Sequence, residues 1–385
     1  MIPFNKPYLT GKEAHYMYQA VYDGHISGNG SFTKKCHQFF EQEYQFGKCL
    51  LTTSCTDALE MAAILIDIQP GDEVIMPSFT FVSTANAFVL RGAKIVFADS
   101  SAFSPNIDVD KIESLISSKT KAIVPVHYAG VACDMDKIEY LAEKYNLYII
   151  EDAAQAIESF YKGRRLGSIG HLAAFSFHET KNITSGEGGL LVVNDKTLQR
   201  RAEIIWEKGT NRAEFFRGEV NKYGWVDVGS SFLPSDIIAA FLYAQLENIQ
   251  DIQTKRKSLW RSYFDFLKPL EKKGLIQLPV LPDFGTNNAH MFYFICANET
   301  VRNALLVYLK ETGIYAVFHY LPLHESPYYQ PKHDGRILEN SIAFSQRIIR
   351  LPFFYELKAE QVRMICDRVS EFYHSDAAVY SGVNI

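Results

Sequence analysis

The sequence has no closely spaced cysteine pairs and no long apolar run. Its six cysteines are scattered over 385 residues without a CxxC motif, which predicts neither a disulfide framework nor a zinc site. No apolar run approaches the about 20 residues of a membrane helix, and the first residues lack the apolar core of a signal peptide. We therefore expect free thiols, no membrane partner and a cytoplasmic location. The cysteines are Cys36, Cys49, Cys55, Cys133, Cys296 and Cys366.

A dense cluster of basic residues is also missing. The chain has 39 Lys and Arg against 44 Asp and Glu, a formal charge of −5, which predicts no nucleic-acid partner. An anionic ligand must then be held by local groups rather than by the field of the whole protein. No GxGxxG fingerprint follows an apolar run, and this argues against a nicotinamide cofactor.

The first half of the chain alternates short apolar runs with helical patterns such as residues 135–145. Such alternation predicts an α/β fold with a mostly parallel sheet that carries ligand groups at the carboxyl ends of its strands. The runs that we expect to be strands are residues 73–77, 94–98, 122–126, 147–150, 172–177 and 190–194.

The second half begins with residues 235–267, which read as one long helical region leading to a second domain. The length also favours roughly two domains, and we place them at 1–245 and 246–385. Residues 290–296 resemble a strand and residues 301–311 a helix. The last dozen residues have little periodicity and predict a tail.

Two polar segments follow predicted strands or open predicted helices. The turn at residues 52–57 (TTSCTD) precedes an Ala/Leu/Met-rich helix, and its N–H groups and hydroxyls suit a phosphate. The same turn also fits an ordinary helix N-cap. Asp152 follows the run 147–150, where a carboxylate can meet a positively charged ring nitrogen. A turn aspartate or a ribose-binding acid are the other interpretations of this position.

Lys181 lies in the segment FSFHETKN, just beyond the run 172–177. A lysine at a buried strand end is partly desolvated, so its amine becomes available as a nucleophile or base. Most lysines are solvated surface groups, so this position alone does not establish catalysis. His178 fits a pocket or packing histidine better than a metal ligand, because no partner has the spacing of a metal site. The glycine-rich residues 185–189 allow a sharp return into the next strand.

One cofactor accounts for these segments together. Pyridoxal 5'-phosphate (PLP) needs a lysine for its Schiff base, an acid at its pyridinium nitrogen, a phosphate cradle and a face for its ring. Phe81, which follows the run 73–77, can supply that face. The order of phosphate turn, aromatic, Asp and Lys is far more specific than any one of them.

These segments resemble the DegT/StrS family of sugar-nucleotide aminotransferases over nearly the whole chain. The resemblance begins at IPFN (residues 2–5) and SGNG (residues 27–30) and continues in GDEVIMPSFTFVSTANA, VPVHYAG, EDAAQA, FSFHETKN, HYLPLH and LPFF. It implies the PLP-dependent transferase type I fold, with a large domain built on a mostly parallel seven-stranded sheet between helices. A smaller C-terminal α+β domain would follow. It also implies a homodimer with shared active sites.

By this resemblance Lys181 is the Schiff-base lysine and Asp152 the partner of the pyridinium nitrogen. Gln155 would lie beside the ring hydroxyl and Phe81 on the ring face.

The resemblance further implies a phosphate cradle, in which two positions depart from the family pattern. Many relatives have Gly at position 55, and many have Asn at position 231, which the other subunit contributes to the phosphate. The cradle residues are Ser54, Cys55, Thr56, Ser176 and Ser231.

The closest family motifs belong to members that aminate dTDP-4-keto-6-deoxyglucose at carbon 4. We therefore expect L-glutamate as the amino donor, that dTDP-sugar as the acceptor, and the galacto product, dTDP-4-amino-4,6-dideoxygalactose, for a surface glycan such as O-antigen. The gluco epimer and amination at carbon 3 of a dTDP-3-keto sugar stay open. Residues 206–225 and 319–324 are predicted to form the sugar cleft, with Arg212, Arg217 and Lys222 as diphosphate candidates or solvated surface charges.

Two other classes share this fold. The sugar dehydratases replace the lysine with His, and Lys181 argues against them. A non-catalytic regulator would be expected to lose Lys181 or Asp152, and both are present.

Overall fold

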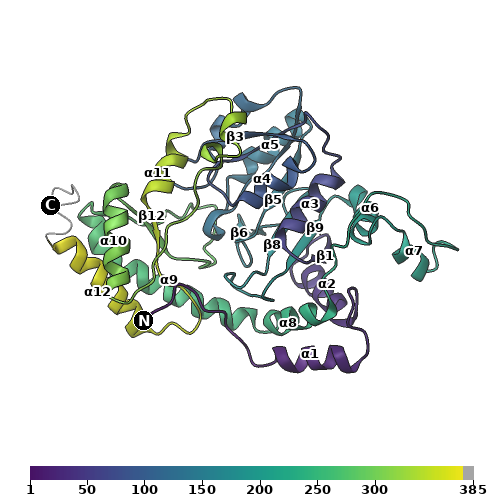
Figure 1. Ribbon diagram of the computed structural model, residues 1–385, viewed down its shortest axis with the longest axis horizontal. Coiled ribbons are helices and arrows are strands. Elements are labelled where there is room, and N and C mark those ends of the chain that lie inside the picture. The colour runs from purple at the N-terminus through teal and green to yellow at the C-terminus, as the bar shows by residue number, and fades with distance from the viewer. Residues whose placement is uncertain (376–385) are drawn as a thin grey trace.

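The computed structural model describes residues 1–375 and centres on a seven-stranded sheet (Figure 1). The strand order is β1-β9-β8-β5-β4-β2-β3, and β9 runs antiparallel to both of its neighbours while the other pairs are parallel. The predicted mostly parallel sheet is confirmed. Its strands are β1 (Lys48–Thr52), β2 (Glu73–Pro77), β3 (Lys94–Ala98), β4 (Thr120–Ile123), β5 (Tyr148–Asp152), β8 (Leu172–Ser176) and β9 (Gly189–Val193).

Helices cover both faces of this sheet. Successive side chains of a strand point to opposite faces, so Leu50 and Leu51 of β1 belong to two different buried clusters. This double burial explains why the strands are continuous apolar runs. The helices of this part are α1 (Glu13–Tyr22), α2 (Ser31–Glu43), α3 (Cys55–Leu65), α4 (Val82–Val89), α5 (Met135–Tyr145), α6 (Lys196–Trp206), α7 (Arg212–Phe216) and α8 (Asp236–Leu246).

A second, three-stranded antiparallel sheet has the order β10-β11-β12 and shares an apolar cluster with the helices around it. Ile2 joins this cluster, and its backbone pairs with Gly313 and Tyr315, so the N-terminal segment lies against the C-terminal half. The elements are α9 (Ile249–Lys272), β10 (Ile276–Gln277), β11 (Tyr293–Cys296), α10 (Glu299–Glu311), α11 (Glu339–Arg347), β12 (Ile348–Arg350) and α12 (Ala359–His374). A small hairpin of β6 (Phe160–Tyr161) and β7 (Arg164–Arg165) completes the strands.

The prediction of one long helix over residues 235–267 is wrong, because the chain forms α8 and α9 with a break at Glu247 and Asn248. The Asn248 side chain donates a hydrogen bond to the Ala244 carbonyl at 2.9 Å. A side chain that takes over a backbone partner in this way competes with continued helix. The domain boundary at 245/246 stays a prediction.

The strands predicted at 122–126 and 190–194 are observed at 120–123 and 189–193, and two further differences concern the site. Strand β5 extends to Asp152, so this carboxylate is the last residue of the strand rather than the residue after it. Strand β8 ends at Ser176, which leaves Lys181 in the connection to β9. The predicted tail begins at His374, which ends α12, and residues 376–385 lie outside the described part. Among residues 1–375, no helix combines the length and apolar character needed to cross a membrane.

Candidate active site

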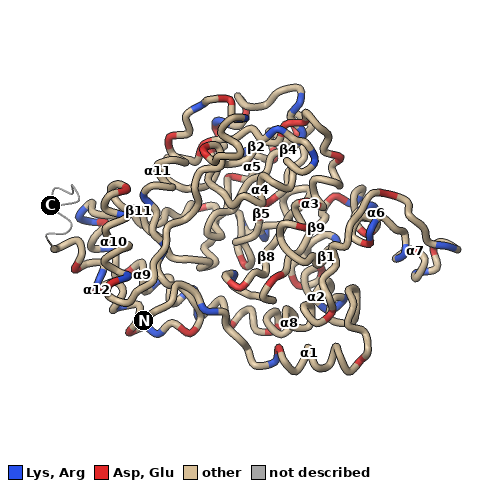
Figure 2. Tube along the Cα trace, viewed as in Figure 1, with Lys and Arg blue, Asp and Glu red and all other residues tan. Residues whose placement is uncertain are grey.

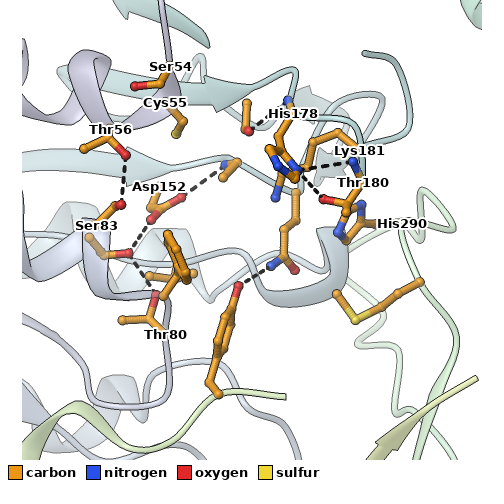
Figure 3. Close-up of a pocket in the computed structure, with 18 of the residues that line it drawn as sticks. Ser54, Cys55, Thr56, Thr80, Ser83, Asp152, His178, Thr180, Lys181 and His290 are labelled. Carbon is orange, nitrogen blue, oxygen red and sulfur yellow. Dashed lines mark hydrogen bonds between the residues drawn. The ribbon is translucent and has the colours of Figure 1, made fainter. Parts of the chain in front are cut away.

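A cavity of about 710 Å³ lies where the carboxyl ends of β5 and β8 meet the start of α3. A cavity at this edge of the sheet is where an open α/β fold binds its ligand. The cavity brings together eight of the nine predicted site residues (Figure 3). They are Ser54, Cys55, Thr56, Phe81, Asp152, Gln155, Ser176 and Lys181.

The predicted phosphate turn is a helix cap, as the other interpretation of this turn expected, and its role as a phosphate site stays a prediction. Ser54 is the N-cap of α3, and its hydroxyl accepts a hydrogen bond from the Asp57 N–H at 3.1 Å. Cys55 and Thr56 then begin the helix, where the backbone N–H groups have no acceptor within the helix. A Cβ on Gly189 would lie 2.4 Å from the Ser54 carbonyl oxygen, so only glycine lets β9 approach this turn. The turn therefore offers an anion both N–H groups and the positive end of the helix dipole.

Asp152 is buried at the end of β5 and is held by two donors. The Thr84 hydroxyl donates to one carboxylate oxygen at 2.6 Å, and the Ala154 N–H donates to the other at 3.1 Å. Thr84 is itself 2.9 Å from the Thr80 hydroxyl. These two hydrogen bonds fix the orientation of the carboxylate at the cavity wall.

Lys181 lines the same cavity from the turn that follows β8, and its backbone N–H bonds to the His178 carbonyl at 2.9 Å. Among the described residues, no carboxylate lies within ion-pair distance of its amine. Burial lowers the pKa of Lys181, and the nearby charge of Arg350 lowers it further, against the opposing effect of Cys55 and Asp152. A larger fraction of this amine is therefore neutral and nucleophilic than in a solvated lysine.

Gln155 presents a defined face of its amide to the cavity. Its oxygen accepts a hydrogen bond from the Ala129 N–H at 2.6 Å, so its NH2 group donates to the Tyr320 hydroxyl at 3.1 Å. Phe81 is 56% exposed and precedes α4, which leaves its ring available to a ligand.

His178 also lines the cavity, as one of its two interpretations predicted. Its Nδ1 lies 2.9 Å from the Thr180 hydroxyl and its Nε2 lies 3.7 Å from Glu187.

The predicted sugar cleft is only partly present in the single chain. His319 and Tyr320 line the cavity, whereas His324 is buried with its Nδ1 2.6 Å from the Ser78 hydroxyl. No residue of 206–225 lines this cavity. Sequence reasoning did not assign Phe4, His290 and Arg350 to the site, because they come from segments far apart in the chain.

The diphosphate candidates and Ser231 lie outside this cavity as well. Arg217 forms ion pairs with Glu203 at 3.0 Å and Glu219 at 2.8 Å, and Arg212 lies over the Phe216 ring. Figure 2 shows the intermixed charges of α6 and α7. Ser231 is exposed, and it is the one predicted cradle residue that its own chain does not bring to the site.

The donor set of the cavity fits PLP. A lysine with a lowered pKa, a buried carboxylate and the N-terminus of α3 match the aldehyde, the ring nitrogen and the phosphate of that cofactor. The close approach of Gly189 to Ser54 keeps the cradle free of side chains at that point.

Comparison with known proteins agrees with this geometry. Residues 8–370 match the model of the DegT/DnrJ/EryC1/StrS aminotransferase family. The chain is 34% identical over 380 residues to the GDP-perosamine synthase of Escherichia coli O157:H7, covering 97% of this chain and 98% of that one. It is 32% identical to the spore coat polysaccharide biosynthesis protein SpsC of Bacillus subtilis (strain 168), covering 96% of each.

A solved structure shows the same fold with the cofactor named. Spr1654 from Streptococcus pneumoniae, solved in its PLP form, superposes with a TM-score of 0.89 at 26% identity and covers 99% of this chain and 100% of that one. The cofactor is PLP. The chain therefore belongs to the DegT/DnrJ/EryC1/StrS aminotransferase family, and it is a PLP-dependent sugar aminotransferase.

Proposed function

We propose that this enzyme transfers the amino group of L-glutamate to carbon 4 of dTDP-4-keto-6-deoxyglucose in the cytoplasm. The product would be dTDP-4-amino-4,6-dideoxygalactose, a precursor of a surface glycan. The observation that carries the amino transfer is that Lys181 and the buried Asp152 line one cavity next to the N-terminus of α3. The choice of sugar is supported by FSFHETKN and by GSS (residues 229–231), which resemble the motifs of the family members that aminate carbon 4.

Bound PLP supplies an electron-withdrawing ring that stabilises negative charge on the carbon losing a proton. Lys181 would hold the cofactor, and its freed amine would take the proton from the donor's α carbon and deliver it to the former aldehyde carbon of the cofactor. Its lowered pKa suits this exchange, because a base works best when its pKa lies near the working pH. Asp152 would face the ring nitrogen, and the Thr84 and Ala154 hydrogen bonds fix the orientation of its carboxylate.

The remaining predicted residues would orient the cofactor. Gln155 would lie beside the ring hydroxyl, and Phe81 would cover one ring face. Ser54, Cys55, Thr56 and Ser176 bind the phosphate, and burial together with the Asp152 charge raises the pKa of the Cys55 thiol, so that position stays neutral. In a homodimer the partner subunit's Ser231 would complete the phosphate site, which is consistent with its exposure in the single chain.

The nucleotide that carries the sugar differs between this proposal and the name of one relative. The Escherichia coli relative is named for a GDP-linked product, so a GDP-linked 4-keto sugar is the alternative acceptor. The name of SpsC supports a polysaccharide pathway and leaves the carrier open. Amination at carbon 3 and the gluco epimer are further alternatives.

The test offers purified enzyme L-glutamate with each of three acceptors: the dTDP-linked 4-keto sugar, its GDP-linked counterpart and a dTDP-linked 3-keto sugar. Product NMR identifies the aminated carbon and whether the amine is axial or equatorial. We expect efficient turnover of the dTDP-linked 4-keto sugar to the axial amine, and none by Lys181→Ala. Turnover of the GDP-linked or the 3-keto sugar alone would reject the proposed acceptor.

A further inference from the structure

Arg350 ends β12 and is the only arginine among the described residues that line the cavity. Its Nε atom is buried and has no hydrogen-bond partner. One Nη contacts the Phe318 carbonyl at 3.5 Å, the outer limit of a hydrogen bond. A buried guanidinium N–H without a partner is costly, so its occurrence at a cavity wall points to a ligand that is absent from the free chain.

Arg256, a nearby arginine with a structural role, has a different environment. Arg256 is buried behind the cavity, and it donates to the Ala289 carbonyl at 3.0 Å and to the His290 carbonyl at 2.7 Å. Arg350 has no such partners, and no described carboxylate forms an ion pair with it. Its guanidinium instead lies 4.8 Å from the centre of the Phe4 ring, a contact that holds the cation without neutralising it.

The groups beside Arg350 are electrostatically compatible with a bound anion. His290 and His319 line the cavity beside it, and burial together with the charge of Arg350 lowers the pKa of both histidines well below the ordinary value. They are therefore neutral at pH 7. Burial also lowers the pKa of Arg350 itself, a sign that the guanidinium is poorly solvated. A bound anion would supply the missing acceptor and the opposite charge.

We propose that Arg350 binds a carboxylate of the amino donor while the donor reacts at Lys181. This inference rests on the proposed function, in which the donor is glutamate. A guanidinium fits a carboxylate with two parallel N–H···O bonds. The cofactor phosphate has its own donors at the start of α3, so it has no need of Arg350. When the sugar replaces the donor, the Phe4 ring and the Phe318 carbonyl remain to hold the side chain.

The test measures the two half-reactions separately by the absorption spectrum of the bound cofactor. Arg350→Gln should raise the glutamate concentration needed for half-maximal conversion by about 10- to 100-fold, the loss expected for a charge-assisted hydrogen bond. The limiting rate and the half-saturating concentration of the nucleotide sugar should change less than about threefold. Arg347→Gln is the matched control, because Arg347 lies three residues earlier and donates to the Cys296 carbonyl outside the cavity.

Two further experiments distinguish the α-carboxylate of glutamate from its side-chain carboxylate and provide a control for misfolding. A comparison of glutamate with alanine as donor identifies the carboxylate: an equal loss for both assigns the α-carboxylate, and a loss for glutamate alone assigns the side-chain carboxylate. Glutarate binding, followed by the cofactor spectrum without turnover, should weaken in Arg350→Gln. If that variant does not fold, Arg350→Lys takes its place, with a smaller loss expected because the charge remains while the two-pronged geometry is lost.

Unchanged glutamate dependence in Arg350→Gln would overturn the proposal, as would a loss confined to the nucleotide sugar, which would assign Arg350 to the diphosphate. Failure of the wild-type enzyme to use any keto sugar would reject the proposed acceptor while the first half-reaction still tests Arg350. No conversion of the wild-type cofactor by glutamate or alanine would reject the donor and this proposal together.

Discussion

At the residue scale, burial of the Lys181 ammonium lowers the free energy of unfolding by an amount that depends on pH. Burial lowers its pKa from the ordinary value of 10.5, so the unfolded chain holds this proton more tightly than the folded apoprotein does. The cost of the buried ammonium is fully present below the folded-state pKa. It decreases as the pH rises toward the unfolded value.

We therefore predict that Lys181→Met apoprotein has a higher melting temperature than wild-type apoprotein at pH 7. The difference should shrink as the pH approaches about 10. The measurement is thermal unfolding of both apoproteins across this pH range. Taking the difference in melting temperature removes the pH dependence that comes from ionisable groups present in both proteins. A difference that stays constant with pH would mean that the amine does not lose its proton more readily when folded.

Asp152 is predicted to act through its charge at the ring nitrogen. Asp152→Asn should still bind PLP but slow the half-reaction with glutamate by at least about 100-fold, which is about 2.7 kcal/mol of barrier. Stopped-flow absorbance gives the rate. Thr84→Val, which removes one hydrogen bond to the carboxylate and leaves the charge, should cost no more than about tenfold. An unchanged rate in Asp152→Asn would mean that another residue holds the ring nitrogen.

At the scale of elements, α8 caps α2. The N-cap of α2 is Gly30, which has no side chain, and the buried Asp236 of α8 accepts hydrogen bonds from the Phe32 and Thr33 N–H groups at 3.2 and 2.8 Å. A Cβ on Gly30 would lie 2.4 Å from the Asp236 carboxyl carbon. One carboxylate therefore joins two helices that are about 200 residues apart in sequence.

We predict that Asp236→Ala destabilises the protein by about 1–3 kcal/mol, because it leaves buried N–H groups without an acceptor. Thermal unfolding should show a clear decrease in melting temperature. Asp265→Ala serves as the control, since Asp265 is exposed and forms an (i, i+4) pair with Arg261 that contributes little. Equal melting temperatures for the two variants would show that α2 is capped in another way.

At the scale of the whole molecule, the proposed dimer would use the exposed segment between α7 and α8, which carries Ser231. Several large apolar side chains are exposed, including Tyr22 on α1 and Trp225, which is 85% exposed, in the segment between α7 and α8. Ser231 lies in the same segment as Trp225.

We predict that each active site uses the partner subunit's Ser231. Lys181→Ala and Ser231→Tyr variants, each inactive or weak alone, should regain activity when mixed subunits assemble. In such a hybrid, one site has both Lys181 and the partner subunit's unaltered Ser231. The recovered activity is measured after dissociation and reassociation, with sedimentation confirming dimers. A hybrid with no recovery would place Ser231 in the site of its own chain.

Local sequence patterns were enough to predict several helices and strands of this protein. The helix over residues 135–145 and the strands over 73–77 and 94–98 have the predicted bounds. Their periodicity and flanking residues are properties of neighbouring positions, which sequence displays directly. The order of phosphate turn, aromatic, Asp152 and Lys181 likewise indicated the chemistry, because a parallel sheet brings successive strand ends to one edge.

Only the tertiary structure decided which distant segments meet. The break between α8 and α9 depends on the side chain of Asn248, which periodicity does not register. Phe4 and Arg350 come from opposite ends of the chain, and they reach the cavity because the N-terminal segment pairs with the C-terminal half. Contacts of this range are set by the packing of whole elements rather than by local preference, so the groups that shape the substrate end of the site became visible only in the folded chain.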